Sequence, residues 1–393
     1  MNTPLENLSA IEIGERLRIA REVANLKQGS AAEAINMSRT TLIAIEQGQR
    51  RVRMDELLKL SKIYGTSVNA LMRSQAIHVD LTPKFRKLVG ERDETGHGAS
   101  KVLADLAKAE VELENLLGVQ RARNYPPERP LAPGNVVLQA EQDALELRQR
   151  LGLGLSPVAD IISLLELELG VRVYVRRLDS HVAGLFAYDE KVGACIMINA
   201  RHPRDRRTFT AAHELGHLVS TRREPDVLHD GSPERTPEER YCNAFARAFI
   251  MPPRALMQKF KDFTAGSPRL TRRHIIVLAH FFNVSREAIV RRLEELKLTK
   301  PGSWDWFQDN GGITDDQVRE VLGDLVLADP ARAEAMQPTT LRLNMLASEA
   351  WRQGLLSEGQ LMRLLHIDRV EIRHFLDKVE IGGAADEAPI LPL

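Results

Sequence analysis

The stretch that decides the fold of this 393-residue chain is Arg207-Thr-Phe-Thr-Ala-Ala-His213-Glu214-Leu215-Gly216-His217. In a helix, two histidines spaced i and i+4 lie on one face about one turn apart, so both imidazoles can reach a single cation. Glu214 points about 100° away from His213 in helical projection, which suits a general base acting on water better than a metal ligand. The pattern predicts a metal centre, and the alternative is a helix that merely packs two histidines.

The residues around this stretch predict that the helix is buried. Phe209-Thr-Ala-Ala212 precedes the first histidine and Leu218-Val219 follows the second, so apolar side chains flank the motif on both sides. Buried polar side chains need a hydrogen-bond partner or a metal ion. This context favours the metal centre over the packing alternative.

A catalytic zinc ion needs a third protein ligand besides two histidines. The candidates that follow in the sequence are Glu224, Asp226, His229, Asp230, Glu234, Glu238 and Glu239. Glu239 is favoured because it opens a predicted helix, and a helix holds a ligand in place better than a loop does. His229 stays an alternative because imidazole is the commoner donor, although it lies between Pro225 and Pro233, where regular structure is not expected. Asn243, one turn past Glu239 on the same face, is placed to hydrogen-bond into the site.

Several motifs, in order along the chain, resemble the ImmA/IrrE-type metallopeptidases. They include Ile196-Met-Ile-Asn199, the stretch from Arg207 to His217, and Glu239-x-x-Cys-Asn-x-Phe-Ala246 running to Met251-Pro252. The resemblance implies a zincin-like domain in which His213, His217 and Glu239 bind Zn²⁺ and Glu214 is the catalytic general base. It also implies proteolysis, although such a domain can survive as a sensor. Members of this family often carry a further histidine soon after the signature, where this chain has Ser220-Thr221-Arg222.

The N-terminal residues 11–73 form short apolar-periodic segments that predict four or five short helices. Ser38 can cap a helix that starts at Arg39, and the inward spacing of Leu42 and Ile45 leaves Arg39, Thr40 and Thr41 on the outer face of the first turn. A helix-turn-helix presents its reading residues to the major groove in this way. Four flanking side chains are candidates for contacts to phosphate: Gln28, Arg50, Arg51 and Arg53.

This segment resembles the helix-turn-helix of XRE-type (lambda-repressor-like) regulators. The resemblance includes Ile45-Glu46-Gln47-Gly48 and the later stretch from Leu57 to Gly65, and it implies that Arg39, Thr40 and Thr41 read bases in double-stranded DNA. The predicted second helix departs from the pattern at Gly29, which costs about 1 kcal/mol relative to alanine. Residues 1–73 carry 11 lysines and arginines against 8 acidic residues, whereas the whole chain is neutral. The alternative is a helical bundle used only for dimerisation.

The composition, together with the glycines and prolines that interrupt helices and strands, predicts four parts in a mainly α protein with a small β-sheet (α+β). These are a helix-turn-helix domain at residues 8–73, a helical and proline-rich linker at 74–134, an ImmA/IrrE-like metallopeptidase domain at 135–299 and a helical C-terminal region at 300–393. Strands are expected at 171–175, 182–188 and 194–199, the last two forming a hairpin. Helices are expected at 139–152 and 156–169, and a two-helix turn near 355–373 is interpreted as a dimerisation or partner-docking segment.

Composition also narrows the class of protein. No uncharged apolar stretch approaches the roughly 18 residues that span a bilayer, and two cysteines cannot build a disulfide framework. We therefore expect a cytoplasmic protein, with Cys242 in a packing role. The predicted function is a DNA-binding transcriptional regulator, acting as a homodimer, whose zinc metallopeptidase-like domain cleaves a partner or regulator protein. The substrate would pair as an extended strand on the edge of the 182–199 hairpin. The alternative is a non-enzymatic regulator whose metal pocket is a ligand or stress sensor.

Overall fold

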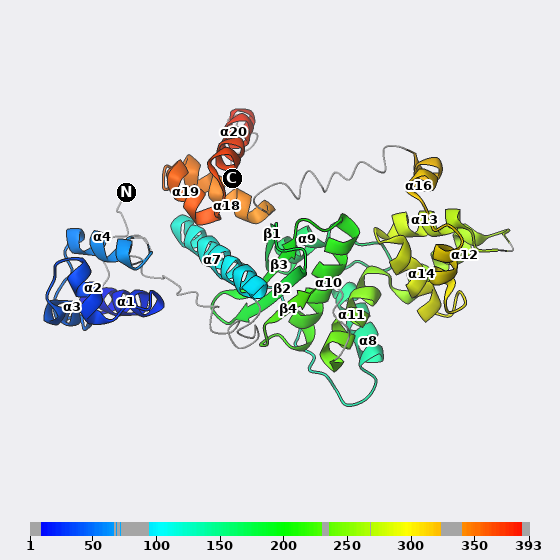
Figure 1. The fold of residues 1–393 in the computed structure, drawn as a ribbon, viewed down its shortest axis with the longest axis horizontal. Helices are drawn as coiled ribbons and strands as arrows, with labels where there is room; N and C mark the ends of the chain where they lie inside the picture. Colours follow the sequence, from blue (N-terminus) through cyan, green and yellow to red (C-terminus); the bar gives the residue numbers. More distant parts are fainter. Residues whose placement is uncertain are drawn as a thin grey trace. The chain divides into compact units, whose positions relative to one another are not determined.

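The structure is a computed structural model that describes residues 9–66, 68, 71, 94–229, 236–267, 269–323 and 340–386. The chain divides into two compact units, one of residues 1–80 with 108–120 and one of residues 81–107 with 121–393. The described part is mainly helical with one four-stranded sheet, which confirms the predicted fold class (Figure 1). None of the helices in the described residues is long and apolar enough to cross a membrane.

In the described residues, the N-terminal bundle has four short helices: α1 (Ala10–Val23), α2 (Gln28–Ala34), α3 (Arg39–Glu46) and α4 (Met54–Ile63). Leu17, Leu42 and Leu60 are fully buried in its core. Ser38 caps α3 by accepting a hydrogen bond from the backbone N–H of Thr41 at 3.1 Å, as the sequence predicts. At Gly14, α1 comes so close to the end of α3 that a Cβ atom would lie 2.3 Å from the carbonyl oxygen of Ile45.

The sheet has the strand order β1-β3-β2-β4. Its strands are β1 (Arg172–Arg176), β2 (Val182–Asp189), β3 (Gly193–Asn199) and β4 (Asp226–His229). β2 and β3 form the predicted antiparallel hairpin, and β1 pairs with β3 in parallel. β4 was not predicted, and it pairs antiparallel with the other edge of β2. Both edges of the hairpin are therefore covered by strands of the chain itself, so the predicted docking edge for a substrate strand is not free in this conformation.

Three helices build the layer beside the sheet: α8 (Val136–Arg150), α10 (Arg204–Ser220) and α11 (Pro237–Ile250). α10 packs on β2 and β3, and α11 packs on both α10 and α8. On α11, Tyr241, Phe245 and Phe249 recur every fourth residue, stack in sequence along one face and are completely buried. The apolar spacing of α10 and α11 thus produces the single core that carries the histidine motif.

The helix predicted from Ser156 starts later than expected. Residues up to Asp160 are irregular, and α9 (Ile161–Ser163) leads directly into the π-helix η2 (Leu164–Glu168). Asp160 acts as the N-cap by accepting hydrogen bonds from the backbone N–H groups of Ile162 and Ser163. An aspartate cap competes with a serine-proline start, and the sequence alone does not show which of the two is used.

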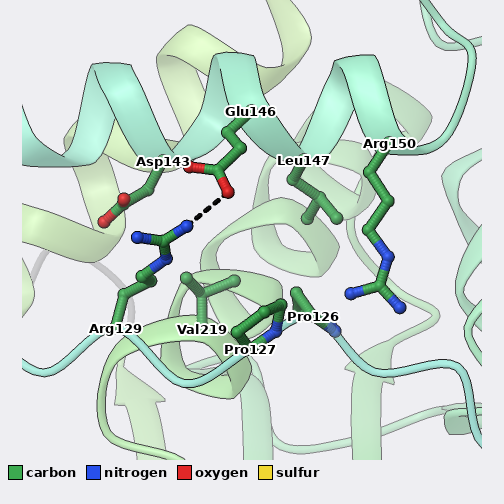
Figure 2. Close-up of a pocket in the computed structure, with 8 residues that line it drawn as sticks. All are labelled: Pro126, Pro127, Arg129, Asp143, Glu146, Leu147, Arg150 and Val219. Atoms are coloured by element: carbon green, nitrogen blue, oxygen red, sulfur yellow. Dashed lines mark hydrogen bonds and ion pairs between the residues drawn. The ribbon is translucent and has the colours of Figure 1, made fainter.

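The proline-rich segment at residues 124–133 forms neither helix nor strand, as its composition predicts, but it is anchored to the sheet-bearing domain. The backbone N–H of Arg129 donates to the carbonyl oxygen of Val219, and that of Asn124 donates to Leu169. Figure 2 shows a pocket where this segment faces α8, with Arg129 paired to Glu146 across it. Fixed proline φ angles leave such a segment little entropy to lose when it is held against a surface.

In the described residues, nine further helices precede or follow these elements in the sequence. They are α7 (Glu94–Leu117), α12 (Pro253–Thr264), α13 (Arg272–Phe282), α14 (Arg286–Glu295), α15 (Ser303–Asp309), α16 (Asp315–Leu322) and a C-terminal group of α18 (Leu341–Arg352), α19 (Glu358–Leu365) and α20 (Arg369–Asp386). Glu166 accepts a hydrogen bond at 3.1 Å from the backbone N–H of Arg342, near the start of α18. Arg176 donates at 2.9 Å to the carbonyl oxygen of Leu365, at the end of α19. These contacts hold the C-terminal helices against the domain that contains the sheet.

Arg148 gives a stability prediction for this core. Its guanidinium is completely buried, donates to the carbonyl oxygens of Gly154, Ser156 and Phe249, and has a pKa that burial lowers to about 10. Arg148→Met should lower the free energy of unfolding by about 2–4 kcal/mol because it leaves buried carbonyl groups without donors. Denaturant unfolding measures this, with Gln149→Met at the exposed neighbouring position of the same helix as the control. Equal losses in both variants would contradict the assignment.

Candidate metal centre

The two histidines of the motif lie side by side on α10. His213, Glu214 and His217 are buried to within 1% of full burial, and the imidazole ring centroids are 5.1 Å apart. Phe186 of β2 stacks on the ring of His217 with a centroid distance of 5.9 Å. The helix thus presents both imidazoles to one point beside the sheet, as the i, i+4 spacing predicts.

α11 brings Glu239 and Asn243 to His213. Thr236 caps the helix by accepting from the backbone N–H of Glu239 at 3.1 Å, and Pro237 occupies its first turn. Glu239 Oε2 lies 3.7 Å from His213 Nε2, and Asn243 Oδ1 lies 2.9 Å from His213 Nδ1. Because this amide oxygen is an acceptor, His213 Nδ1 carries the proton and the lone pair of Nε2 faces the site.

Two further side chains contact the second histidine: Thr221, which the sequence analysis assigned no role, and Glu238, which it considered only as a third ligand. His217 Nδ1 lies 3.3 Å from Thr221 Oγ1 and 3.5 Å from Glu238 Oε1. The hydrogen bond from His217 lowers the pKa of Glu238, and this outweighs the burial that raises it. Thr221 follows His217 at i+4, the same helical spacing that relates the two histidines, so this signal was available in the sequence.

β4 adds one further carboxylate. Asp226 Oδ2 lies 3.5 Å from His217 Nε2 and is buried without a hydrogen-bond partner. His213, His217, Asp226 and Glu239 offer donor atoms that all lie within 4.8 Å of one another. Asp226 was one of seven sequence candidates for the third ligand, and nothing in its local pattern separated it from the others. His229 is not part of this group.

Cys242 is the competing neighbour of the two histidines. Its Sγ atom and one nitrogen of each imidazole all lie within 4.8 Å of one another, so a second possible ligand set is His213, His217 and Cys242. Burial raises the pKa of this thiol, which disfavours the thiolate that binds metals. Its backbone also packs against α10, because a Cβ atom added at Gly216 would lie 3.0 Å from the Cα atom of Cys242. We therefore keep Cys242 in the packing role and take the two carboxylates as the donors.

The predicted DNA-reading residues lie on and beside α3. Arg39 and Thr40 are exposed on its first turn, and Thr41, which is half-buried, shares the Ser38 hydroxyl with Thr40. Of the four predicted phosphate contacts, Arg51 and Arg53 are exposed. The other two contact acidic side chains of the bundle: Gln28 donates to Glu46 at 2.8 Å, and Arg50 pairs with Glu56 at 2.8 Å.

Family models match both segments. Residues 167–294 match the model described as the IrrE N-terminal-like domain, and residues 12–73 match a helix-turn-helix domain. The chain carries these two domains, in this order. Among solved structures it is similar to the apo form of the competence regulator ComR from Streptococcus vestibularis, with 11% identity over 98% of this chain and 95% of that chain and a TM-score of 0.17. No curated protein sequence matches the chain.

The charges in the IrrE-like domain suit a bound dication. Burial and the neighbouring His217 lower the pKa of His213 to about 3, so this imidazole is neutral and can donate a lone pair. Burial and the negative charges of Asp226 and Glu239 raise the pKa of Glu214 well above its usual range. A dication at this point relieves the repulsion between the carboxylates. The buried Nε2 atoms of both histidines and Asp226 Oδ2 have no hydrogen-bond partner, so these residues fit a metal ion.

Proposed function

We propose that this protein is a DNA-binding transcriptional regulator whose IrrE-like domain binds Zn²⁺ and cleaves a peptide bond in a partner or regulator protein. One observation carries the proposal. Two buried imidazole nitrogens without a hydrogen-bond partner lie close to Glu239 and beside the buried carboxylate of Glu214. Two histidines and one glutamate form the ligand set of several hydrolytic zinc sites. We further propose that the protein acts as a homodimer in the cytoplasm.

In this mechanism His213, His217 and Glu239 hold the ion, which supplies a Lewis acid that acidifies water and polarises a carbonyl group. Glu214 accepts the proton of the attacking water on a carboxylate oxygen and then delivers it to the leaving amine. Neither Glu214 oxygen has another hydrogen-bond partner, so both are available for this transfer. Asn243 keeps His213 in the tautomer whose Nε2 lone pair faces the ion.

The second candidate is a regulator that uses the metal pocket as a sensor and cleaves nothing. The position of Asp226 favours it, since this second carboxylate gives the site a fourth protein donor, whereas a catalytic site keeps that position open. Capture of proteins on a Glu214→Gln variant, followed by incubation of each with the wild-type protein, separates the two candidates. New peptide termini found by mass spectrometry support the peptidase, and intact captured proteins support the sensor.

The DNA-binding half of the proposal rests on the exposed first turn of α3. Arg39→Ala in the full-length protein should weaken binding to an operator fragment, selected from random DNA, by about 5- to 150-fold, because a side chain that contacts a base is lost. Arg18→Ala is the control, since this half-buried arginine lies on α1 and, among the described residues, pairs with Glu15 and Glu22 of the same helix. Fluorescence anisotropy measures both affinities, which should also fall as salt rises. Equal affinities for the two variants would contradict the assignment of α3.

A further inference from the structure

We infer that β4 is an inhibitory strand of the chain itself, which closes the proposed metal centre by supplying Asp226 as a fourth protein ligand. The inference rests on the proposed function and adds its regulation. Two independent observations support it: where β4 pairs, and which donor atoms it brings to the site.

The first observation is the pairing of β4 with β2. Asp226 is the register partner of Phe186, and the antiparallel ladder continues through Leu185 with Val227. Directly opposed residues of a ladder place their side chains on the same face of the sheet. The ring of Phe186 stacks on His217, so this register directs the Asp226 carboxylate to the same histidine. A slip by one residue would turn Asp226 to the other face.

The second observation is the spacing of the donor atoms. Bonds of about 2.0–2.2 Å to a tetrahedral zinc ion place neighbouring donors roughly 3.3–3.6 Å apart. The two measured separations are 3.5 Å, between His217 Nε2 and Asp226 Oδ2, and 3.7 Å, between His213 Nε2 and Glu239 Oε2. Two of the six separations among the four donors are therefore close to the tetrahedral value, and none of the six exceeds 4.8 Å. A structural zinc site has four protein ligands, whereas a catalytic one leaves a position open.

The strand also occupies the place of a substrate. An extended peptide binds a sheet by pairing with an exposed edge, and β4 covers the edge of β2 that lies beside the metal centre. All four residues of β4 are half-buried, whereas β3 is buried throughout. A short, half-exposed strand is among the first elements of a domain to open. Displacing β4 would free the edge of β2 and remove the fourth ligand together.

Zinc affinity tests the ligand assignment without any activity assay. Asp226→Ala and the nearly isosteric Asp226→Asn should each weaken zinc binding at least tenfold in competition with a chromophoric chelator, because each removes a charged donor. Glu224→Ala is the control: this carboxylate lies on the same connection, is exposed, and is not in the ligand group. Circular dichroism of the metal-free proteins verifies that all variants fold.

Cobalt(II) in place of zinc tests whether the site is closed. The visible absorption of the wild-type cobalt protein should not change with added acetohydroxamate, whereas that of Asp226→Ala should shift as the ligand takes the vacated position. Zinc should also slow amide hydrogen exchange at residues 226–229 in the wild type and not in Asp226→Ala.

Wild-type zinc affinity in both Asp226 variants, or a wild-type cobalt spectrum that shifts with acetohydroxamate, would overturn the inference and leave the proposed metal centre standing. A wild-type protein that binds no zinc would instead overturn the metal centre itself.

Discussion

Glu214→Gln should reduce proteolysis about 10²–10⁴-fold while the protein keeps its zinc, because glutamine has the size of glutamate but cannot accept a proton. The carboxylate of Glu214 is completely buried beside the ligand group and is not a member of it. Its loss should therefore leave the coordination of the ion intact. Metal content by elemental analysis and cleavage of a captured partner protein measure the two effects separately.

His213→Ala is the matched variant on the same helix and should lose the metal itself. Its imidazole is a proposed ligand whose Nδ1 is held by Asn243, so alanine removes a donor and leaves the amide without its partner. A Glu214→Gln protein without zinc would make Glu214 a ligand. A Glu214→Gln protein that still cleaves at the wild-type rate would remove the general-base role.

The elements that the sequence predicted well are those fixed by local patterns. Ser38 caps α3, the hairpin of β2 and β3 follows from two apolar segments around a short turn, and α10 and α11 follow from apolar residues repeated at helical spacing. Each of these signals lies within about one element of the chain, so no knowledge of the tertiary structure is needed to use it.

β4 could not be predicted in this way. Its partner strand begins more than forty residues earlier, and its four residues, Asp-Val-Leu-His, lie just after Pro225, in a segment whose composition indicates a loop. Whether such a short segment pairs depends on an open edge elsewhere in the fold, not on its own propensity. The role of Asp226 was hidden for the same reason, because only the register with Phe186 directs it to His217.

The candidate site was predictable wherever helical spacing determines it. Glu239 and Asn243 share one face of α11, and both reach His213. Glu238 precedes Glu239 and reaches the other histidine instead, which depends on how α11 is rotated against α10. The two helices pack closely where Gly216 meets Cys242, a tertiary contact that no local pattern reveals.

The choice between Glu239 and His229 as the third ligand can be decided by metal titration. Glu239→Ala should weaken zinc binding at least tenfold, and His229→Ala should leave it nearly unchanged. Glu239 Oε2 lies 3.7 Å from His213 Nε2 and is held on a capped helix, whereas His229 lies at the far end of β4, opposite Val182. A ligand on a helix keeps its position within a few tenths of an ångström more readily than one on a short edge strand.

The same titration distinguishes Glu239 from Asp226, since both are carboxylates of the ligand group. Glu239 is a proposed ligand both when β4 is paired with β2, which closes the site, and when β4 is displaced, which opens it. Loss of Glu239 should therefore lower zinc affinity in both states. Loss of Asp226 affects only the closed site. Glu239→Ala should therefore weaken binding at least as much as Asp226→Ala does. If His229→Ala weakened binding and Glu239→Ala did not, the third ligand would be His229, and the proposed hydrolytic mechanism would lose its main support.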